Sequence, residues 1–329
     1  MDENLDYYIN LLQKLNRASN KGFGKAPHKP ILLISIIQLI RNNVITSNRI
    51  FITPELVLSF KSNWNNLVNT EHTPNFSLPF FHLKNDLKSN HFWTLTANIG
   101  FQQTFLKLKS INSFKKLKDT IAFAEINKQL FLLLKNNETN LFLEQFLIKK
   151  YFGIINYDYL KIDSSKIELK IEDEILNEDK TTYQARINEL HLTLDENEFE
   201  EEIFIRGGLF KKMIPKIYNY QCCISGMKID TIKNAQMVDA CHIIPFSISH
   251  DDTIPNGLSL SPNLHRAFDR GLITINRDYI VRISPTITDN KSVYSISQFN
   301  GNQIILPIKT KWYPSTESLI WHTKEMFQL

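Results

Sequence analysis

Residues 239–271 read DACHIIPFSISHDDTIPNGLSLSPNLHRAFDRG, and this stretch decides the fold that we expect for the C-terminal part of the chain. His242, Asn256 and His265 lie within it at spacings of 14 and 9 residues, and Asp269 follows four residues later. Side chains four residues apart share one face of a helix, so His265 and Asp269 can reach a common ion if a helix forms there. Either these polar residues form hydrogen bonds to one another inside a small domain, or they form a catalytic site.

The residues around this polar set predict a strand, a loop, a second strand and a helix, in that order. Residues 237–244 are mostly apolar and end at a proline, and the turn-rich SHDDTIPNG follows shortly after. Residues 258–260 predict the second strand. Ser261 suits a helix cap and Pro262 suits the first helical turn, so we expect the helix to begin there.

Length, composition and charge indicate a soluble protein of two domains. The chain has 329 residues, of which 43% are hydrophobic, and its net charge of +4 permits a polyanionic partner without requiring one. Residues 1–160 carry about eight more Lys and Arg than Asp and Glu, whereas residues 161–205 are acidic. We therefore expect an N-terminal domain at 1–160, a solvated acidic linker at 161–205 with at most one strand or helix of its own, and a C-terminal domain at 206–329. An acidic docking tail is the alternative interpretation of the linker.

Cysteine usage and apolar runs indicate a cytoplasmic protein without a membrane segment. The chain has an odd number of cysteines: Cys222, Cys223 and Cys241. This number argues against a framework of disulfides and fits a protein of a reducing compartment. The N-terminus is acidic where a secretion signal would be basic. The longest apolar run, residues 30–40, is too short to cross a bilayer and predicts a buried helix.

The N-terminal part is expected to be mostly helical with a small sheet. Apolar spacing and helix-start signals predict helices at 2–17, at 30–42 with Pro30 first, and at 52–68 beginning after Thr53, and residues 100–160 are expected to be largely helical. The aromatic runs LPFFHL (78–83) and FWTL (92–95) predict paired strands.

The stretch ACHIIPF, with NGLSLSPNLHRAFDRG after it, resembles the HNH nuclease family, in particular its restriction-type members. This resemblance extends to Ile273 and implies an α+β protein whose C-terminal domain has the ββα-metal (His-Me finger) fold. Residue by residue, it implies His242 as the general base and His265 as a metal ligand. It implies that Asn256 orients the imidazole and ties the loop, and that Asp269 is a further ligand.

Phosphodiester hydrolysis requires the chemistry that these residue types supply. A neutral imidazole can accept a proton from water near pH 7, and a cation can offset the charge that develops on the phosphate. One imidazole with carboxylates suits a single Mg²⁺ or Mn²⁺ per site. Many family members place a ligand directly before the base, but Cys241 occupies that position and is a poor partner for Mg²⁺. Asp239 shares a strand face with Cys241 and is a second candidate ligand, provided that the strand twists or bulges there.

The cysteines indicate neither a structural zinc nor a thiol nucleophile. The two knuckles that carry four thiolates in many HNH domains read Cys223-Ile-Ser-Gly226 and Ser261-Pro-Asn-Leu264 here, so we expect no structural zinc. The cysteines are expected to be packed thiols. A nucleophilic pair of Cys241 with the next residue is disfavoured because neighbours on a strand point to opposite faces.

The segments KAPHKPILLI (25–34), LPFFHLKND (78–86) and HFWTL (91–95) resemble the sulfur-binding domain of HNH restriction enzymes that read phosphorothioate DNA. The resemblance implies DNA contacts near the phosphate backbone or beside an apolar pocket for the sulfur, and basic residues of both domains could add phosphate contacts. The expected DNA-binding residues are Lys21, Lys25, His28, Lys29, Leu78, Pro79, Phe80, Arg266 and Arg270. The prolines and aromatic residues could instead frame a helix and fill a core, and the two arginines could be surface charges.

Together these features predict a metal-dependent DNA endonuclease of restriction type, with double-stranded DNA, modified or not, as its partner. One site per chain favours a homodimer for cutting both strands. Two alternatives stay open: a sequence-specific HNH restriction endonuclease that ignores modification, and a DNA-binding protein whose nuclease site has decayed.

Overall fold

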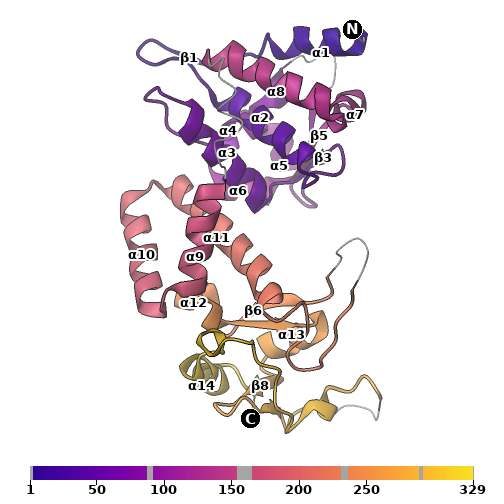
Figure 1. Cartoon of the computed structure of the whole chain (residues 1–329), viewed down its shortest axis with the longest axis vertical. Helices are drawn as coiled ribbons and strands as arrows, with labels where there is room; N and C mark the ends of the chain where they lie inside the picture. Colours follow the sequence, from indigo (N-terminus) through magenta and orange to yellow (C-terminus); the bar gives the residue numbers. More distant parts are fainter. Residues whose placement is uncertain (1–2, 87–91, 154–164, 231–235, 289–291, 329) are drawn as a thin grey trace. The chain divides into compact units, whose positions relative to one another are not determined.

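The computed structural model describes residues 3–86, 92–153, 165–230, 236–288 and 292–328 (Figure 1). The chain divides into two compact units, which we call unit 1 (Met1–Glu168 and Leu194–Ile205) and unit 2 (Leu169–Thr193 and Arg206–Leu329). Helices and small antiparallel sheets make up both, which confirms the α+β class. No helix in the described ranges is long and apolar enough to cross a membrane.

Unit 1 is mainly helical around one three-stranded antiparallel sheet with the order β3, β5, β4. Its elements are α1 (Glu3–Leu12), β1 (Ser19–Asn20), β2 (Gly24–Lys25), α2 (His28–Arg41), β3 (Arg49–Ile50), α3 (Pro54–Leu67), α4 (Ser77–His82), η1 (Leu83–Asn85), β4 (Trp93–Ala97), α5 (Gln102–Lys107), α6 (Phe114–Thr120), β5 (Ile121–Ile126), α7 (Lys128–Lys135) and α8 (Asn137–Phe152).

Helix α2 lies at the centre of unit 1 and packs against α3 and α8. Its residues from Pro30 to Ile37 are all buried, as in a helix that others enclose. It begins at His28, two residues before the expected Pro30. Helix α3 begins as expected, because the hydroxyl of Thr53 accepts a hydrogen bond from the amide of Leu56 at 3.3 Å and Pro54 occupies the first helical position.

The expected strand at 78–83 is wrong: these residues form α4 and the start of η1. Phe80 and Phe81 are neighbours and both fully buried, whereas a strand would turn one of them to the opposite face. The indole nitrogen of Trp93 donates to the carbonyl of Phe80 at 2.9 Å, which fastens α4 to β4. Strand β4 forms as expected, but its partner is β5, with Trp93 opposite Ile126.

Unit 2 contains helices, two-stranded ladders and short 3₁₀ turns. Its elements are α9 (Ser165–Asn177) from Leu169 on, α10 (Lys180–Thr193), α11 (Glu196–Ile217) from Arg206 on, β6 (Asp239–His242), α12 (Phe246–Ser249), η3 (Ile254–Asn256), β7 (Gly257–Leu260), α13 (Pro262–Asp269), β8 (Ile273–Ile275), β9 (Val281–Ile283), η4 (Ile296–Phe299), η5 (Thr310–Trp312) and α14 (Thr316–Glu325). The preceding residues of α9 and α11 belong to unit 1.

Most of the segment that we expected to be a solvated linker is helical where the structure describes it. Residues 165–193 form α9 and α10, and their apolar side chains at four-residue spacing are buried: Ile171, Ile175, Tyr183 and Ile187. Four-residue spacing places such side chains on one helix face, and most of the charged residues lie on the other faces. Glu174 is an exception, because it is buried and forms an ion pair with Arg206. Residues 161–164 of the expected linker lie outside the described residues.

The predicted order of strand, loop, strand and helix is confirmed in unit 2. Strands β6 and β7 pair antiparallel, with Asp239 opposite Leu260 and His242 opposite Gly257. Ser261 precedes α13 as expected, but its hydroxyl donates to the Asn263 side chain at 2.7 Å instead of capping the helix. Helix α11 crosses the hairpin so closely that a Cβ on Gly257 would lie 2.2 Å from the Cδ1 atom of Ile214.

Helix α14 fastens the end of α13. The ring of His322 stacks on Phe268 with centroids 3.6 Å apart, and its Nε2 atom donates to the Phe268 carbonyl at 3.1 Å. Burial lowers the pKa of His322 to about 4, so the ring is neutral near pH 7. Gly271 has a left-handed φ of +64°, and a Cβ there would lie 1.8 Å from the carbonyl oxygen of Met326.

Candidate functional site

His242, at the end of β6, is held between a buried carboxylate and an aromatic ring. Its Nε2 atom lies 2.8 Å from Oδ1 of Asp252, whose side chain is only 1% exposed. The imidazole stacks on Phe210 of α11 with centroids 4.0 Å apart and an interplanar angle of 6°. Because an ionised carboxylate only accepts hydrogen bonds, it fixes the tautomer with the proton on Nε2. The Nδ1 atom then carries a lone pair that can accept a proton.

Residues of the helices α9, α10 and α11 hold this carboxylate. The buried hydroxyl of Tyr183 lies 3.5 Å from Oδ2 of Asp252. Burial, followed by the charge of Asp252, raises the pKa of Tyr183 far above its usual range, so the hydroxyl remains a donor. Arg206 lies over the Tyr183 ring and forms an ion pair with Glu174 at 2.7 Å. The expected linker therefore contributes to the support of the His242 site. The immediate partner of His242 is Asp252, which no sequence motif singled out.

Asn256 ties the loop between β6 and β7 at both ends. Its Oδ1 atom accepts from the amide of Ile244 at 2.9 Å, and its Nδ2 atom donates to the carbonyls of Ile244 and Asp251, each at 2.9 Å. These contacts correspond to the loop-tying part of the expected role. The other part, orienting the imidazole of His242, falls to Asp252 in this geometry.

A second group of polar side chains surrounds His265 on α13. Its Nδ1 atom lies 3.5 Å from Oδ2 of Asp239, and its Nε2 atom lies 3.4 Å from Oδ2 of Asp269. The three side chains are 25%, 51% and 57% exposed, in the order His265, Asp239 and Asp269, so solvent reaches them. Both expected carboxylates therefore contact the expected histidine.

Cys241 belongs to the same group, although we expected it only to pack. Its Sγ atom is buried and lies 3.8 Å from Oδ1 of Asp269. Ligand atoms of Cys241, His265 and Asp269 all lie within 4.8 Å of one another, close enough to hold a metal ion. Burial, with the charge of Asp269 second, raises the pKa of the Cys241 thiol well above its usual range. Strand alternation, which places Cys241 and Asp239 on one face of β6, is the signal that could have revealed it.

The two groups occupy opposite faces of β6. His242 faces α11, whereas Asp239 and Cys241 face α13. No hydrogen bond or ion pair among the described residues joins His242 to His265. Arg266 and Arg270 are exposed on α13. Cys222 and Cys223 are buried in the turn before β6, and the Cys222 sulfur accepts from the amide of Ser225 at 3.5 Å.

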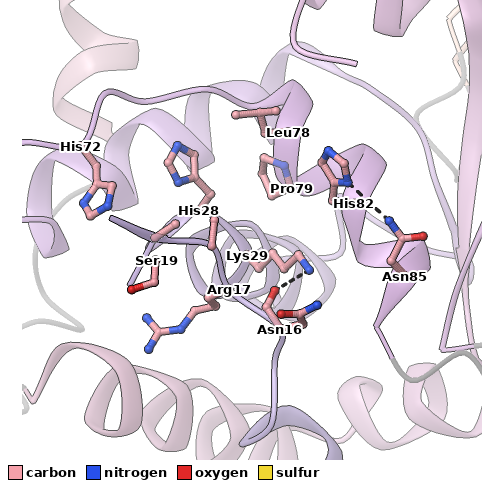
Figure 2. A pocket seen from close by; sticks show the side chains of 12 residues that line it. Asn16, Arg17, Ser19, His28, Lys29, His72, Leu78, Pro79, His82 and Asn85 are labelled. Carbon is pink, nitrogen blue, oxygen red and sulfur yellow. Dashed lines mark hydrogen bonds between the residues drawn. The ribbon is translucent and has the colours of Figure 1, made fainter. Parts of the chain in front are cut away.

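Unit 1 contains a pocket of about 630 Å³ that brings together four of the expected DNA-binding residues (Figure 2). These are His28, Lys29, Leu78 and Pro79. The full lining is Asn16, Arg17, Ala18, Ser19, Ala26, His28, Lys29, His72, Leu78, Pro79, His82 and Asn85. Phe80, expected beside the pocket, is fully buried instead and packs edge-on against Trp93.

Two of the basic residues that line this pocket are bonded to protein groups, and the guanidinium of a third, Arg17, lies 4.6 Å from the centre of the Tyr151 ring. Lys29 forms an ion pair with buried Asp86 and donates to the carbonyl of Asn16 at 2.6 Å. The Nε2 atom of His28 bonds the carbonyl of Thr73 at 3.0 Å, and burial lowers the pKa of His28 to about 4. The polar atoms of His28 and Lys29 are therefore bonded to protein groups in this structure, and their expected contact with the phosphate backbone stays a prediction. Lys21 and Lys25 are exposed on the β1–β2 hairpin beside it.

Comparison with known proteins identifies the region around β6, β7 and α13. Residues 222–276 match the model of the HNH endonuclease family, so this region is an HNH endonuclease domain. Among solved structures, the chain is similar to a modification-dependent TagI restriction endonuclease, at 20% identity and a TM-score of 0.25. That similarity covers 34% of this chain and 35% of the other, so it spans about a third of the other protein's length. No curated protein matches the chain.

Proposed function

We propose that this chain, with an HNH endonuclease domain at residues 222–276, is a metal-dependent DNA endonuclease of a restriction or defence system. The observation that carries the proposal is the His242–Asp252 pair, which leaves one ring nitrogen able to accept a proton in the same unit as the His265 group. A nuclease whose site had decayed would have no need to keep a buried carboxylate aligned with an imidazole that solvent can reach. Cutting both strands would require two copies of the chain, so we propose a homodimer.

His242 is the general base in this mechanism. Its Nδ1 atom removes a proton from a water molecule whose oxygen attacks the phosphorus, while the bond from phosphorus to the 3′ oxygen breaks. Asp252 stabilises the imidazolium that forms, because its negative charge contacts the Nε2–H group. Phe210 confines the ring to one plane, so the lone pair keeps its direction.

His265, with Asp239 or Asp269, has the donor atoms to hold the divalent cation. The imidazole and carboxylates fit a cation, and the exposed carboxylates leave room for a phosphate oxygen. Mg²⁺ or Mn²⁺ is the ion that we expect first. When bound, such an ion offsets the negative charge on the phosphate and on the departing oxygen. Arg266 and Arg270 are proposed to contact neighbouring phosphates.

Asp252→Asn is expected to slow cleavage by about 10²-fold or more, within the range that general-base catalysis contributes. The amide has the size of the carboxylate, but its NH₂ group can donate to Nε2 and move the ring proton to Nδ1. Single-turnover cleavage of a DNA duplex measures the effect. Asp251→Asn is the matched control, because the neighbouring buried Asp251 accepts from the amide of Thr253. Equal rates for the two variants would contradict the role of Asp252.

We further propose that unit 1 reads modified DNA through its pocket. The apolar side chains of Ala18, Ala26, Leu78 and Pro79 suit a group less polar than a phosphate oxygen, such as phosphorothioate sulfur or a base methyl group. The guanidinium of Arg17 in the same lining is proposed to pair with the charge of the DNA backbone. Lys21 and Lys25 on the neighbouring hairpin are proposed to contact the backbone.

Ala26→Leu is expected to abolish the preference for modified DNA, because the larger side chain occupies part of the pocket. The measurement compares cleavage of phosphorothioated, methylated, hydroxymethylated and unmodified duplexes of one sequence. We expect the native chain to prefer one of the modified duplexes and Ala26→Leu to cut all four at the unmodified rate. Ala97→Leu, on β4 outside the pocket lining, is the control and should keep the preference. If the native chain cuts all four duplexes equally, the modification-independent alternative is correct.

A further inference from the structure

The ring of His265 faces two carboxylates with two different nitrogens. Nδ1 is directed to Asp239 and Nε2 to Asp269, at 3.5 and 3.4 Å. A metal ion binds the lone pair of one ring nitrogen, so in this ring orientation one ion cannot have His265, Asp239 and Asp269 as ligands together. The two carboxylates therefore define alternative positions for an ion around this ring.

A third ligand atom is present at one of these two positions. Ligand atoms of Cys241, His265 and Asp269 lie within 4.8 Å of one another, and Sγ of Cys241 lies 3.8 Å from Oδ1 of Asp269. Bonds of about 2.0–2.3 Å in a tetrahedral site give ligand separations of about 3.3–3.8 Å. Small side-chain movements would therefore close the Cys241–His265–Asp269 group around an ion.

The sulfur lies in an environment that differs from those of the other two cysteines. All three cysteines are buried, but the Cys222 sulfur lies near the hydroxyl of Ser261 and an amide, whereas Cys241 faces a carboxylate. Asp269 is more than half exposed, so an ion can enter from solvent with the buried sulfur at the inner end of the site.

We propose that Cys241 is a metal ligand and that the Cys241–His265–Asp269 group takes a zinc-class cation, Zn²⁺ or Co²⁺, in preference to Mg²⁺. A thiolate selects softer cations, while Mg²⁺ requires oxygen ligands. Three protein ligands leave one tetrahedral position for water or a phosphate oxygen, as in catalytic zinc sites. The thiol loses its proton to solvent when the ion binds. This inference rests on the proposed metal centre of the nuclease and replaces Mg²⁺ as its first expectation.

Titration of the metal-free full chain with Co²⁺, without DNA, tests the proposal. The native chain should bind one Co²⁺ with a near-ultraviolet charge-transfer band from thiolate to cobalt. Cys241→Ala and Cys241→Ser should lose this band. Their affinity for Co²⁺ should fall by about tenfold or more, because the site loses one of its ligands. Cys222→Ala removes a buried thiol outside the group and should keep both the band and the affinity. The thermal midpoint of each variant identifies any that fails to fold.

Two results would overturn the inference: no thiolate band in the native chain, or an undiminished band in a folded Cys241→Ser variant. Because the titration contains no DNA, these results are separate from the proposed function. A chain that cuts DNA but shows no thiolate band would keep the nuclease and remove the ligand role of Cys241. A chain with the band but no cleavage of DNA would keep the metal site and remove the nuclease.

Discussion

His242→Ala is expected to reduce the rate of DNA cleavage by about 10²–10⁴-fold, the usual contribution of a positioned general base. The imidazole is 20% exposed, stacked on Phe210 and bonded to Asp252, so alanine removes the proton acceptor and leaves the backbone of β6 in place. DNA affinity should be unchanged, because the ring carries no role in binding in the proposed mechanism. Single-turnover cleavage and a gel-shift measurement on the same duplex separate the two quantities.

The matched control for this variant is His250→Asn. His250 is exposed, belongs to the same loop region and has a left-handed φ of +48°, which asparagine tolerates. This variant should cut at the native rate. If His242→Ala cuts as fast as His250→Asn, the base is another group and the proposed mechanism fails.

His265→Ala is expected to abolish metal-dependent cleavage and to weaken binding of divalent cations by about 10²-fold or more. His265 contacts both Asp239 and Asp269, so its removal leaves neither candidate position with an imidazole. The ring is partly exposed and alanine favours helices, so α13 should persist. Calorimetric titration with Mn²⁺ and with Zn²⁺, together with cleavage rates over a range of ion concentrations, measures the effect.

Arg266→Ala provides the comparison on the same helix. Arg266 is the next residue and is exposed, and its proposed role is a phosphate contact. This variant should bind cations as the native chain does and bind DNA more weakly, with a smaller dependence on salt. If His265→Ala retains native cation affinity and cleavage, the metal centre does not lie at α13.

Local signals predicted those elements of the fold that have distinct start residues. Thr53 with Pro54, and Ser261 with Pro262, mark the beginnings of α3 and α13 where the structure has them. The errors occur where apolar spacing is ambiguous. LPFFHL is too short to distinguish a strand from a buried helix, and packing of α4 against Trp93 decides for the helix.

The error at residues 165–193 has a related cause. The letters KIELKIEDEIL alternate over a short span, which resembles a strand or a solvated linker. Ile171 and Ile175 are also four residues apart, and the structure uses that second pattern to bury both side chains on α9. Charge composition does not reveal which residues of such a helix are buried.

The candidate site was predictable to the extent that its residues lie close in the chain. His265 and Asp269 are one helical turn apart, and β6 contributes Asp239 by strand alternation. No spacing rule predicts that the carboxylate of Asp252 and the hydroxyl of Tyr183 lie together, because the two residues are 69 positions apart in the chain. Only the folding of α10 against the β6–β7 loop brings them together.

The contacts between α14 and the end of α13 also affect the order in which the parts of the protein fold during synthesis. The Nε2 atom of His322 bonds the carbonyl of Phe268 across 54 residues, and Gly271 receives the backbone of Met326 at a distance that excludes any side chain. A ribosome must therefore complete this distant segment before the helix that bears His265 gains its support. Under the proposed function, the nascent polypeptide has its DNA-reading unit first and its nuclease centre only afterwards, so an unfinished chain would lack cleavage activity.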